Sequence, residues 1–161
     1  MDKELVDSFT YESFIILKEL SVIIDKLEDE EHTTYPANLM AEFSQKIDRI
    51  MGAAQTLEMA TGEHIGLRAI GSIAGNGKKL GQQAAALGKM EFIPVIAAFW
   101  GDTLDVLAEL IPILDDLKQS REVVEKSFRL LQKRLDWLTT QFSRYITPEE
   151  LDKTLKKLGL R

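Results

Sequence analysis

Cysteine is absent from the 161-residue chain, and proline and histidine are scarce, with four and two residues respectively. The absence of cysteine excludes a disulfide framework and thiolate metal sites, and it is typical of a reducing compartment. Long apolar runs are lacking too, since the most apolar one, residues 92–100, is far too short to span a bilayer. The first residues are acidic and polar, where a secretory signal would be basic and then apolar. We therefore expect a cytoplasmic protein that does not insert into a membrane.

Positive charge is in the minority, because 20 lysines and arginines stand against 26 aspartates and glutamates and leave a net charge of −6. An acidic chain of this kind is not expected to bind nucleic acid. Many basic residues gather between residues 126 and 161, where they alternate with carboxylates at helical spacing. That pattern is typical of a solvated helix surface.

Apolar residues at helical spacing dominate what the sequence does contain, and no convincing strand-like alternation occurs. The expected helices run from about Lys3 to Glu30, from Pro36 to Thr61, over residues 63–87 and from near Glu91 onward. The pattern predicts an all-α fold, an antiparallel helical bundle of about five long helices plus a short C-terminal helix. A single domain of residues 1–161 is expected.

The third predicted helix contains five glycines, at positions 66, 71, 75, 77 and 81. Each interior glycine destabilises a helix by about 1 kcal/mol relative to alanine. Glycine is favoured in a helix where another helix packs very close, so we expect this helix to have a close neighbour. Gly88 is expected to end it.

Residues 107–145 carry apolar residues at alternating spacings of three and four, a seven-residue repeat interrupted by Arg121. No glycine or proline lies between Lys118 and Val123. One interpretation, which we favour, is a long helical rod whose exposed second half would pair with a second copy in a homodimer. The other is a hairpin that turns at Gln119-Ser120 and packs the same residues onto the bundle of a monomer.

The C-terminal region, residues 119–161, ends with a clear helix start. Thr147 stands at the cap position, Pro148 at the first helical position and Glu150 at the third. This arrangement predicts a short final helix over residues 151–158.

Motifs of common catalytic and metal sites are missing: there is no glycine-rich phosphate loop, no serine elbow and no zinc-binding histidine–glutamate motif. Carboxylates such as Asp115 and Asp116 are more simply explained by a solvated helix face than by a metal site. We therefore expect no metal and no cofactor. His64 is a candidate phosphate acceptor, since a neutral imidazole can attack phosphorus. The simpler interpretation is that it pairs with the acidic first turn of its own helix.

The segment of residues 54–60 reads Ala-Gln-Thr-Leu-Glu-Met-Ala. It resembles the active helix of histidine phosphotransfer (HPt) domains, including the one that opens chemotaxis histidine kinases. The motif of that family reads Ala-His-Thr/Ser-Leu/Ile-Lys-Gly, on the second helix of a bundle. Ala54, Thr56 and Leu57 match it, and Gly62 matches a glycine that follows. The likeness covers roughly residues 1–118.

Three departures from the HPt motif decide what the resemblance implies. In the family, the histidine takes a phosphoryl group from one protein and passes it to an aspartate on a receiver domain. Here Gln55 falls at the histidine, Glu58 at the lysine and Met59 at the glycine. A glutamine amide cannot hold a phosphoryl group, because its nitrogen lone pair is delocalised, and Glu58 places a repelling anion where the family has a cation.

The resemblance thus implies a non-catalytic signalling module, a pseudo-phosphotransfer bundle that docks a receiver domain or another chemotaxis-type signalling partner. The docking residues that it implies are Gly52, Gln55, Glu58, Met59 and Gly62.

Two other functions stay open at the level of the sequence. A helical phosphatase acting on the aspartyl phosphate of a receiver would need a carboxylate and a polar group on one helix face. Asp115 with Gln119, and Glu58 with Thr61, have that spacing. A purely structural coiled-coil adaptor would dimerise through the heptad region and need no site at all.

Overall fold

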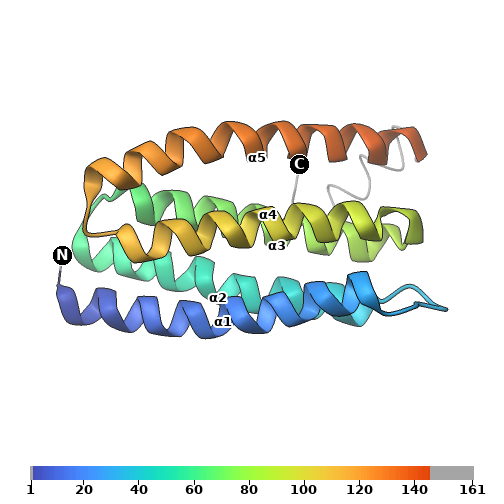
Figure 1. Ribbon diagram of the computed structural model, residues 1–161, viewed down its shortest axis with the longest axis horizontal. Coiled ribbons are helices and arrows are strands. Elements are labelled where there is room, and N and C mark those ends of the chain that lie inside the picture. The colour runs from blue at the N-terminus through green and yellow to red at the C-terminus, as the bar shows by residue number, and fades with distance from the viewer. Residues whose placement is uncertain (1, 146–161) are drawn as a thin grey trace.

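The computed structural model describes residues 2–145, except for the side chains of residues 139 and 142–145. The elements in this part of the chain are α1 (Lys3–Asp29), α2 (Ala37–Thr61), α3 (Ile65–Leu87), η1 (Met90–Phe92), α4 (Ile93–Leu110), η2 (Ile111–Ile113) and α5 (Leu117–Tyr145). All are helical, and the five α-helices run antiparallel in chain order (Figure 1). The predicted all-α bundle is therefore confirmed. The predicted final helix, residues 151–158, lies outside the described residues.

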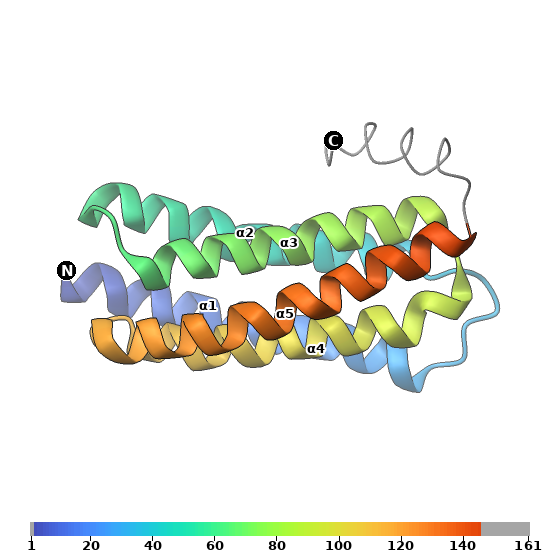
Figure 2. The same cartoon turned by 90° about the horizontal axis from the view of Figure 1, so that it is seen from above.

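Four of the helices form a ring, and the fifth covers one side of it. In the ring, α1 packs on α2 and α4, and α3 packs on the same two helices. The contact between α2 and α3 is the most extensive one. The last helix, α5, contacts both α3 and α4 and crosses over them on the side of the bundle opposite α1 (Figures 1 and 2).

The chain turns between α4 and α5, so the rod that we favoured for residues 107–145 is wrong. Pro112 lies in η2 directly after α4, and its missing N–H cannot continue the helical hydrogen bonding. Asp116 then caps α5, because its Oδ1 accepts a hydrogen bond from the backbone N–H of Gln119 (3.0 Å). The hairpin alternative is the correct one.

The turn comes earlier than the hairpin alternative placed it. Ser120 lies inside α5 rather than in a turn, and its buried hydroxyl donates to the carbonyl of Ile113 (2.9 Å). Further along α5, Leu131 and Leu138 are buried in the core. Much of the apolar repeat is thus used inside the molecule, which removes the exposed stripe on which a heptad homodimer depended.

An aromatic stack joins three helices at the centre of the ring. The rings of Phe43 in α2 and Trp100 in α4 are stacked, with centroids 3.8 Å apart and planes inclined by 9°. Both side chains are completely buried. The indole N–H of Trp100 donates to the carbonyl of Gly77 in α3 (3.2 Å), so this one side chain satisfies its polar atom and fixes the third helix.

All the glycines of α3 except Gly66 face side chains of α2, and a close neighbour is what the sequence predicted. A Cβ at Gly77 would lie 2.9 Å from Cδ1 of Ile47, and one at Gly81 would lie 2.9 Å from Cζ2 of Trp100. Gly81 also faces Ser44, whose hydroxyl donates to the carbonyl of Lys78 (3.2 Å). Two helices cannot pack this closely if a side chain larger than hydrogen stands between them.

The glycine contacts predict opposite effects for two alanine substitutions. Gly81→Ala should destabilise the protein by about 1–3 kcal/mol, because the new methyl group overlaps Ser44 and the rigid indole of Trp100. Gly52→Ala is the matched control in α2, where a Cβ meets nothing within 4 Å. It should stabilise by about 0.5–1 kcal/mol through helix propensity alone. Urea unfolding followed by circular dichroism measures both, and equal effects would contradict the close α2–α3 contact.

Tyr35 ties the loop between α1 and α2 to the end of α3. Its hydroxyl donates to the carbonyl of Ala84 (2.6 Å). Burial raises the pKa of Tyr35 from 10.0 to about 12, because the phenolate would lose its hydration. The neutral form is thus favoured in the folded state, so its contribution to stability is complete below pH 10 and is lost between pH 10 and about 12.

The free energy of unfolding should therefore depend on Tyr35 at alkaline pH. Wild type should exceed Tyr35→Phe in stability at pH 8, by about 1 kcal/mol for the lost hydrogen bond. Between pH 10 and 12 the wild type should lose about 1–2 kcal/mol of stability that the phenylalanine variant keeps, a loss limited by the partial exposure of the phenol. Urea unfolding of both proteins across this range measures the difference. Parallel stability curves for the two proteins would show that Tyr35 ionises as freely in the folded state as in the unfolded one.

Candidate functional site

The residues predicted to dock a partner lie along the second half of α2 and divide into two groups. Gly52, Gln55 and Met59 are spaced by three and four residues, so they share one helix face. Gln55 is exposed, 87% of Met59 is exposed, and a side chain at the half-buried Gly52 would have open space around it. The other two, Glu58 and Gly62, have structural partners.

Gly62 ends α2. Its backbone has φ of +93°, which an L side chain rarely adopts, and its N–H donates to the carbonyl of Glu58 (2.8 Å). A glycine is the usual residue for such a helix end. Its presence at this position is explained by the fold and needs no partner.

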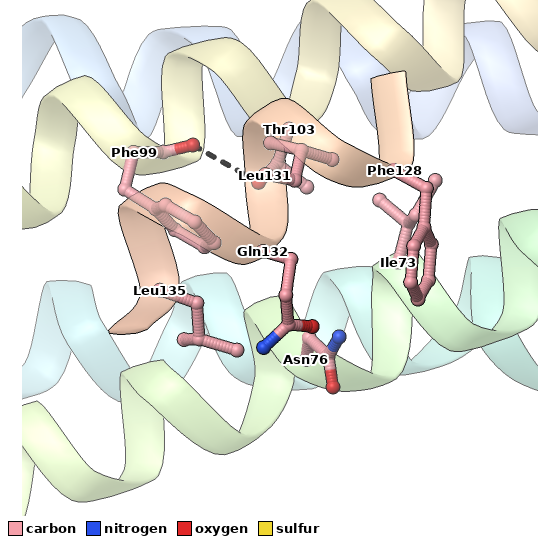
Figure 3. A pocket seen from close by; sticks show the side chains of 8 residues that line it. All are labelled: Ile73, Asn76, Phe99, Thr103, Phe128, Leu131, Gln132 and Leu135. Carbon is pink, nitrogen blue, oxygen red and sulfur yellow. Dashed lines mark hydrogen bonds between the residues drawn. The ribbon is translucent and has the colours of Figure 1, made fainter. Parts of the chain in front are cut away.

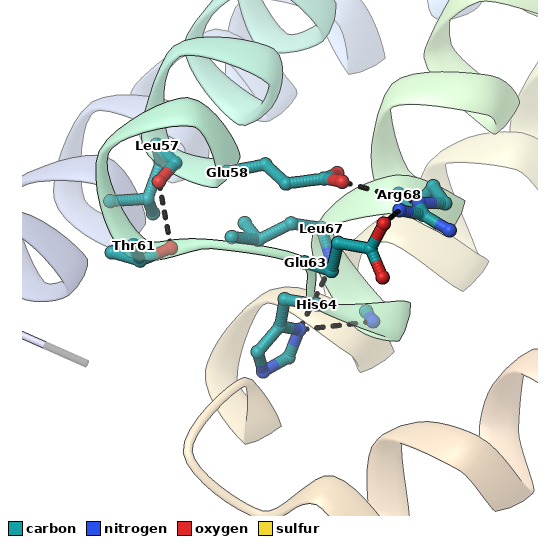
Figure 4. A network of polar contacts seen from close by, with 8 residues as sticks. Leu57, Glu58, Thr61, Glu63, His64, Leu67 and Arg68 are labelled. Atoms are coloured by element: carbon teal, nitrogen blue, oxygen red, sulfur yellow. Dashed lines mark hydrogen bonds and ion pairs between the residues drawn. The ribbon is translucent and has the colours of Figure 1, made fainter.

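Glu58 does not stand as a free anion beside Gln55. Its Oε1 accepts a hydrogen bond from Nε of Arg68 in α3 (3.2 Å), while Nη2 of Arg68 lies 3.1 Å from Oε1 of Glu63 (Figure 4). Hydrogen bonding to Glu58 is the main cause that raises the pKa of Arg68. The repulsion that we expected from Glu58 is therefore largely balanced by a cation from the neighbouring helix, which the sequence pattern had not revealed.

A groove between α2 and α3 runs beside Gln55. Its lining from α2 includes Met51, Gln55 and Glu58. Its lining from α3 includes Arg68, Gly71, Ser72, Gly75, Asn76 and Lys79. The two glycines keep the groove open, since a Cβ at Gly71 would already contact Cγ of Gln55 at 3.7 Å and one at Gly75 would approach Sδ of Met51 to 3.2 Å. The result is a surface rich in amide and cationic hydrogen-bond donors.

Of the predicted docking residues, Gln55 and Glu58 line this groove, and the residues that α3 contributes to it were not predicted. Arg68, Ser72, Asn76 and Lys79 recur at spacings of four, four and three, so they form one stripe on α3. The signal was present, because this stripe borders the glycines at which we expected a close neighbour. The sequence did not show that this neighbour is α2.

His64 is a helix cap, and the pairing that we predicted for it is wrong. Its Nδ1 accepts hydrogen bonds from the N–H groups of Gly66 (3.1 Å) and Leu67 (3.3 Å), at the start of α3 (Figure 4). Its Nε2 lies 2.8 Å from the carbonyl of Leu114 and must donate to it. The first turn of α3 contains no acidic residue to pair with. Because His64 is buried and both ring nitrogens are engaged, it has no free nitrogen to accept phosphate.

Neither residue pair proposed for a phosphatase is arranged for that reaction. Asp115 lies in the turn before α5, so it shares no helix face with Gln119. The hydroxyl of Thr61 donates to the carbonyl of Leu57 (2.8 Å), and Glu58 is paired with a cation (Figure 4). A phosphatase needs a carboxylate and a polar group that are both free to orient water.

A hollow of about 520 Å³ lies between α4 and α5, and its lining includes Asp102, Arg134 and Trp137. A small cavity between α3, α4 and α5, whose lining includes Ile73, Phe99 and Leu131, has a volume of about 10 Å³, room for a single water molecule (Figure 3). No group of three or more histidines, aspartates or glutamates that could hold a metal ion occurs among the described residues. None of the helices described is long and apolar enough to cross a membrane.

In comparisons with known proteins, no family model, no curated protein and no solved structure matches this chain.

Proposed function

We propose that this protein is a non-catalytic signalling module that docks a receiver domain on the α2–α3 face and accepts no phosphate. The observation that carries the proposal is the position of Gln55. It is exposed on the second helix of an antiparallel bundle, at the edge of a groove, where an HPt domain would present its histidine. An HPt-like protein that keeps this surface and lacks the nucleophile can bind a partner without exchanging phosphate.

The chemistry of the face suits a protein partner with an acidic surface. Lys79 supplies positive charge along the groove, and Ser72 and Asn76 add hydrogen-bond donors. Met59 adds a flexible apolar side chain that can adapt to a partner. A receiver domain carries its phosphorylatable aspartate on the surface that an HPt protein contacts, so its charge complements this groove.

The chemistry of the side chains supports the proposed absence of phosphate transfer. An amide nitrogen such as that of Gln55 is not nucleophilic, and His64 has both ring nitrogens occupied. The paired charges of Glu58 and Arg68 also hold the guanidinium in a fixed contact instead of leaving it free to bind a phosphoryl group.

Docking is tested by placing the same side chain at two glycines that are equally open. Gly52→Gln projects from the proposed face, while Gly101→Gln projects from α4, and a Cβ at either position meets nothing within 4 Å. We expect both variants to fold. Gly52→Gln should weaken binding to a receiver domain at least tenfold, roughly, because the new side chain holds the partner away from the groove. Gly101→Gln should bind as the wild type does.

Calorimetric titration with purified receiver domains from the same organism, with and without beryllofluoride, measures these affinities. Equal binding by Gly52→Gln and wild type would refute docking on this face. If no receiver domain binds the wild type, the assignment of the partner is wrong.

Phosphate acceptance is tested by incubating the protein with a phosphorylated receiver domain and with a histidine kinase. Wild type should carry no acid-labile phosphate. Gln55→His places an imidazole at an exposed position and should gain slow phosphorylation if the face has kept the geometry of an HPt site. The partly buried Glu58 stays unchanged in this variant, so its contact with Arg68 is preserved. Phosphohistidine on the wild-type chain, detected by mass spectrometry, would contradict the proposal.

A further inference from the structure

The outer face of α1 exposes large apolar side chains. Tyr11 is 70% exposed, Ile15 43% and Val22 52%. They follow one another at spacings of four and seven, so they share one side of the helix. The residues of α1 that pack into the bundle lie on the opposite side. This face is therefore turned away from α2 and α4 and has no partner among the described residues.

The positions of the residues on this face are symmetric, and the residues at its two ends carry opposite charges. A shallow hollow on α1 is lined by Asp7, Thr10, Tyr11, Phe14, Ile15 and Lys18. These six residues form three pairs placed symmetrically about the point between Glu12 and Ser13. The outer pair is an anion and a cation, the middle pair is a threonine and an isoleucine, and the inner pair is two aromatic residues.

We propose that a second copy of this chain binds here, with the two α1 helices antiparallel about a twofold axis between Glu12 and Ser13. In a twofold contact each residue meets its symmetry mate across the axis, so a face must complement itself. Asp7 then faces Lys18 of the other copy, twice, and Tyr11 faces Phe14 of the other copy, twice.

The charges select this orientation of the pair. A parallel pairing in register would place Asp7 against Asp7 and Lys18 against Lys18, which repels. Within one helix the two residues are about 16 Å apart along the axis, at 1.5 Å per residue, too far to pair with each other. No ion pair within residues 2–145 engages either of them. A second antiparallel copy supplies both with a partner.

The size of the face sets the strength of the contact. One face of a single helix pair buries less than a standard protein interface, so the dimer is expected to be weak, with a dissociation constant in the micromolar range or above. The lining residues of the α2–α3 groove lie on other helices, so dimer formation leaves the proposed docking face open.

Charge reversal tests the pairing directly. Asp7→Lys and Lys18→Asp should each weaken dimerisation on the order of tenfold, because both ion pairs of the interface become repulsive. The double variant Asp7→Lys/Lys18→Asp should dimerise as the wild type does, since the opposite charges meet again. Both Asp7 and Lys18 are exposed, so circular dichroism should show unchanged helicity in each variant.

Analytical ultracentrifugation from about 1 μM to about 1 mM measures the equilibrium across the expected range. A wild-type protein that stays monomeric throughout overturns the proposal. So does a dimer that neither single reversal weakens, which would use another face, or a double variant that stays as weak as the single ones.

A crosslink reports the orientation, because the chain has no cysteine of its own. In the antiparallel pair, two copies of Thr10→Cys are offset by about 7 Å along the axis, within reach of a short bismaleimide, whereas two copies of Asp25→Cys are about 37 Å apart. Thr10→Cys should form a covalent dimer and Asp25→Cys should not. Efficient crosslinking of Asp25→Cys would overturn the antiparallel arrangement.

Discussion

The close contact between α2 and α3 depends on the glycines of α3, and the rest of the core is arranged around that contact. There is no room for a Cβ at Gly77 beside Ile47, or at Gly81 beside Trp100. The short distance between the backbones also lets the Trp100 indole, which stacks on Phe43 of α2, reach the carbonyl of Gly77. Glycine disfavours an isolated helix, so α3 is helical because its packing compensates for its low propensity.

The same contact produces the surface groove next to Gln55. Toward the core, side chains of the neighbouring helices occupy the space beside Gly77 and Gly81. Toward the surface, Gly71 and Gly75 leave an open groove, because only the stems of Gln55 and Met51 approach them. The candidate docking face is therefore a consequence of how α2 and α3 pack, and a change that separates these helices would alter the face as well as the stability.

The sequence predicted those features that depend on nearby residues. Gly88 ends α3 with a φ of +61°, as a helix-ending glycine should, and the glycines of α3 do face a close neighbour. The path of the chain after α4 was predicted wrongly, because the apolar repeat of α5 is the same whether it packs in a rod or in a hairpin. In the structure, Pro112 interrupts the helical hydrogen bonding after α4 and Asp116 caps α5. These local effects outweigh the longer apolar pattern.

The candidate site was only half predictable for a related reason. A motif on α2 can be read along one helix, whereas the contribution of Arg68 depends on which face of α3 lies beside α2. The pairing of Glu58 with Arg68 joins residues from two helices, and it balances a charge that the sequence argument had treated as free. Spacing within a helix identifies a stripe of residues, but only the packing of that helix against its neighbour shows what the stripe adjoins.

The two proposed contacts use separate faces, and this separation has a physical consequence. A dimer formed through the outer face of α1 carries two copies of the α2–α3 groove, and the two contacts share no residue. Binding of a monomeric partner should then be independent of dimerisation, since coupling requires a difference in contacts between the two states. A dimeric partner that spans both grooves binds with higher overall affinity, because its second contact is intramolecular. Because a weak α1 contact forms only at higher protein concentration, the affinity for a dimeric partner would depend on protein concentration. The affinity for a monomeric partner would not.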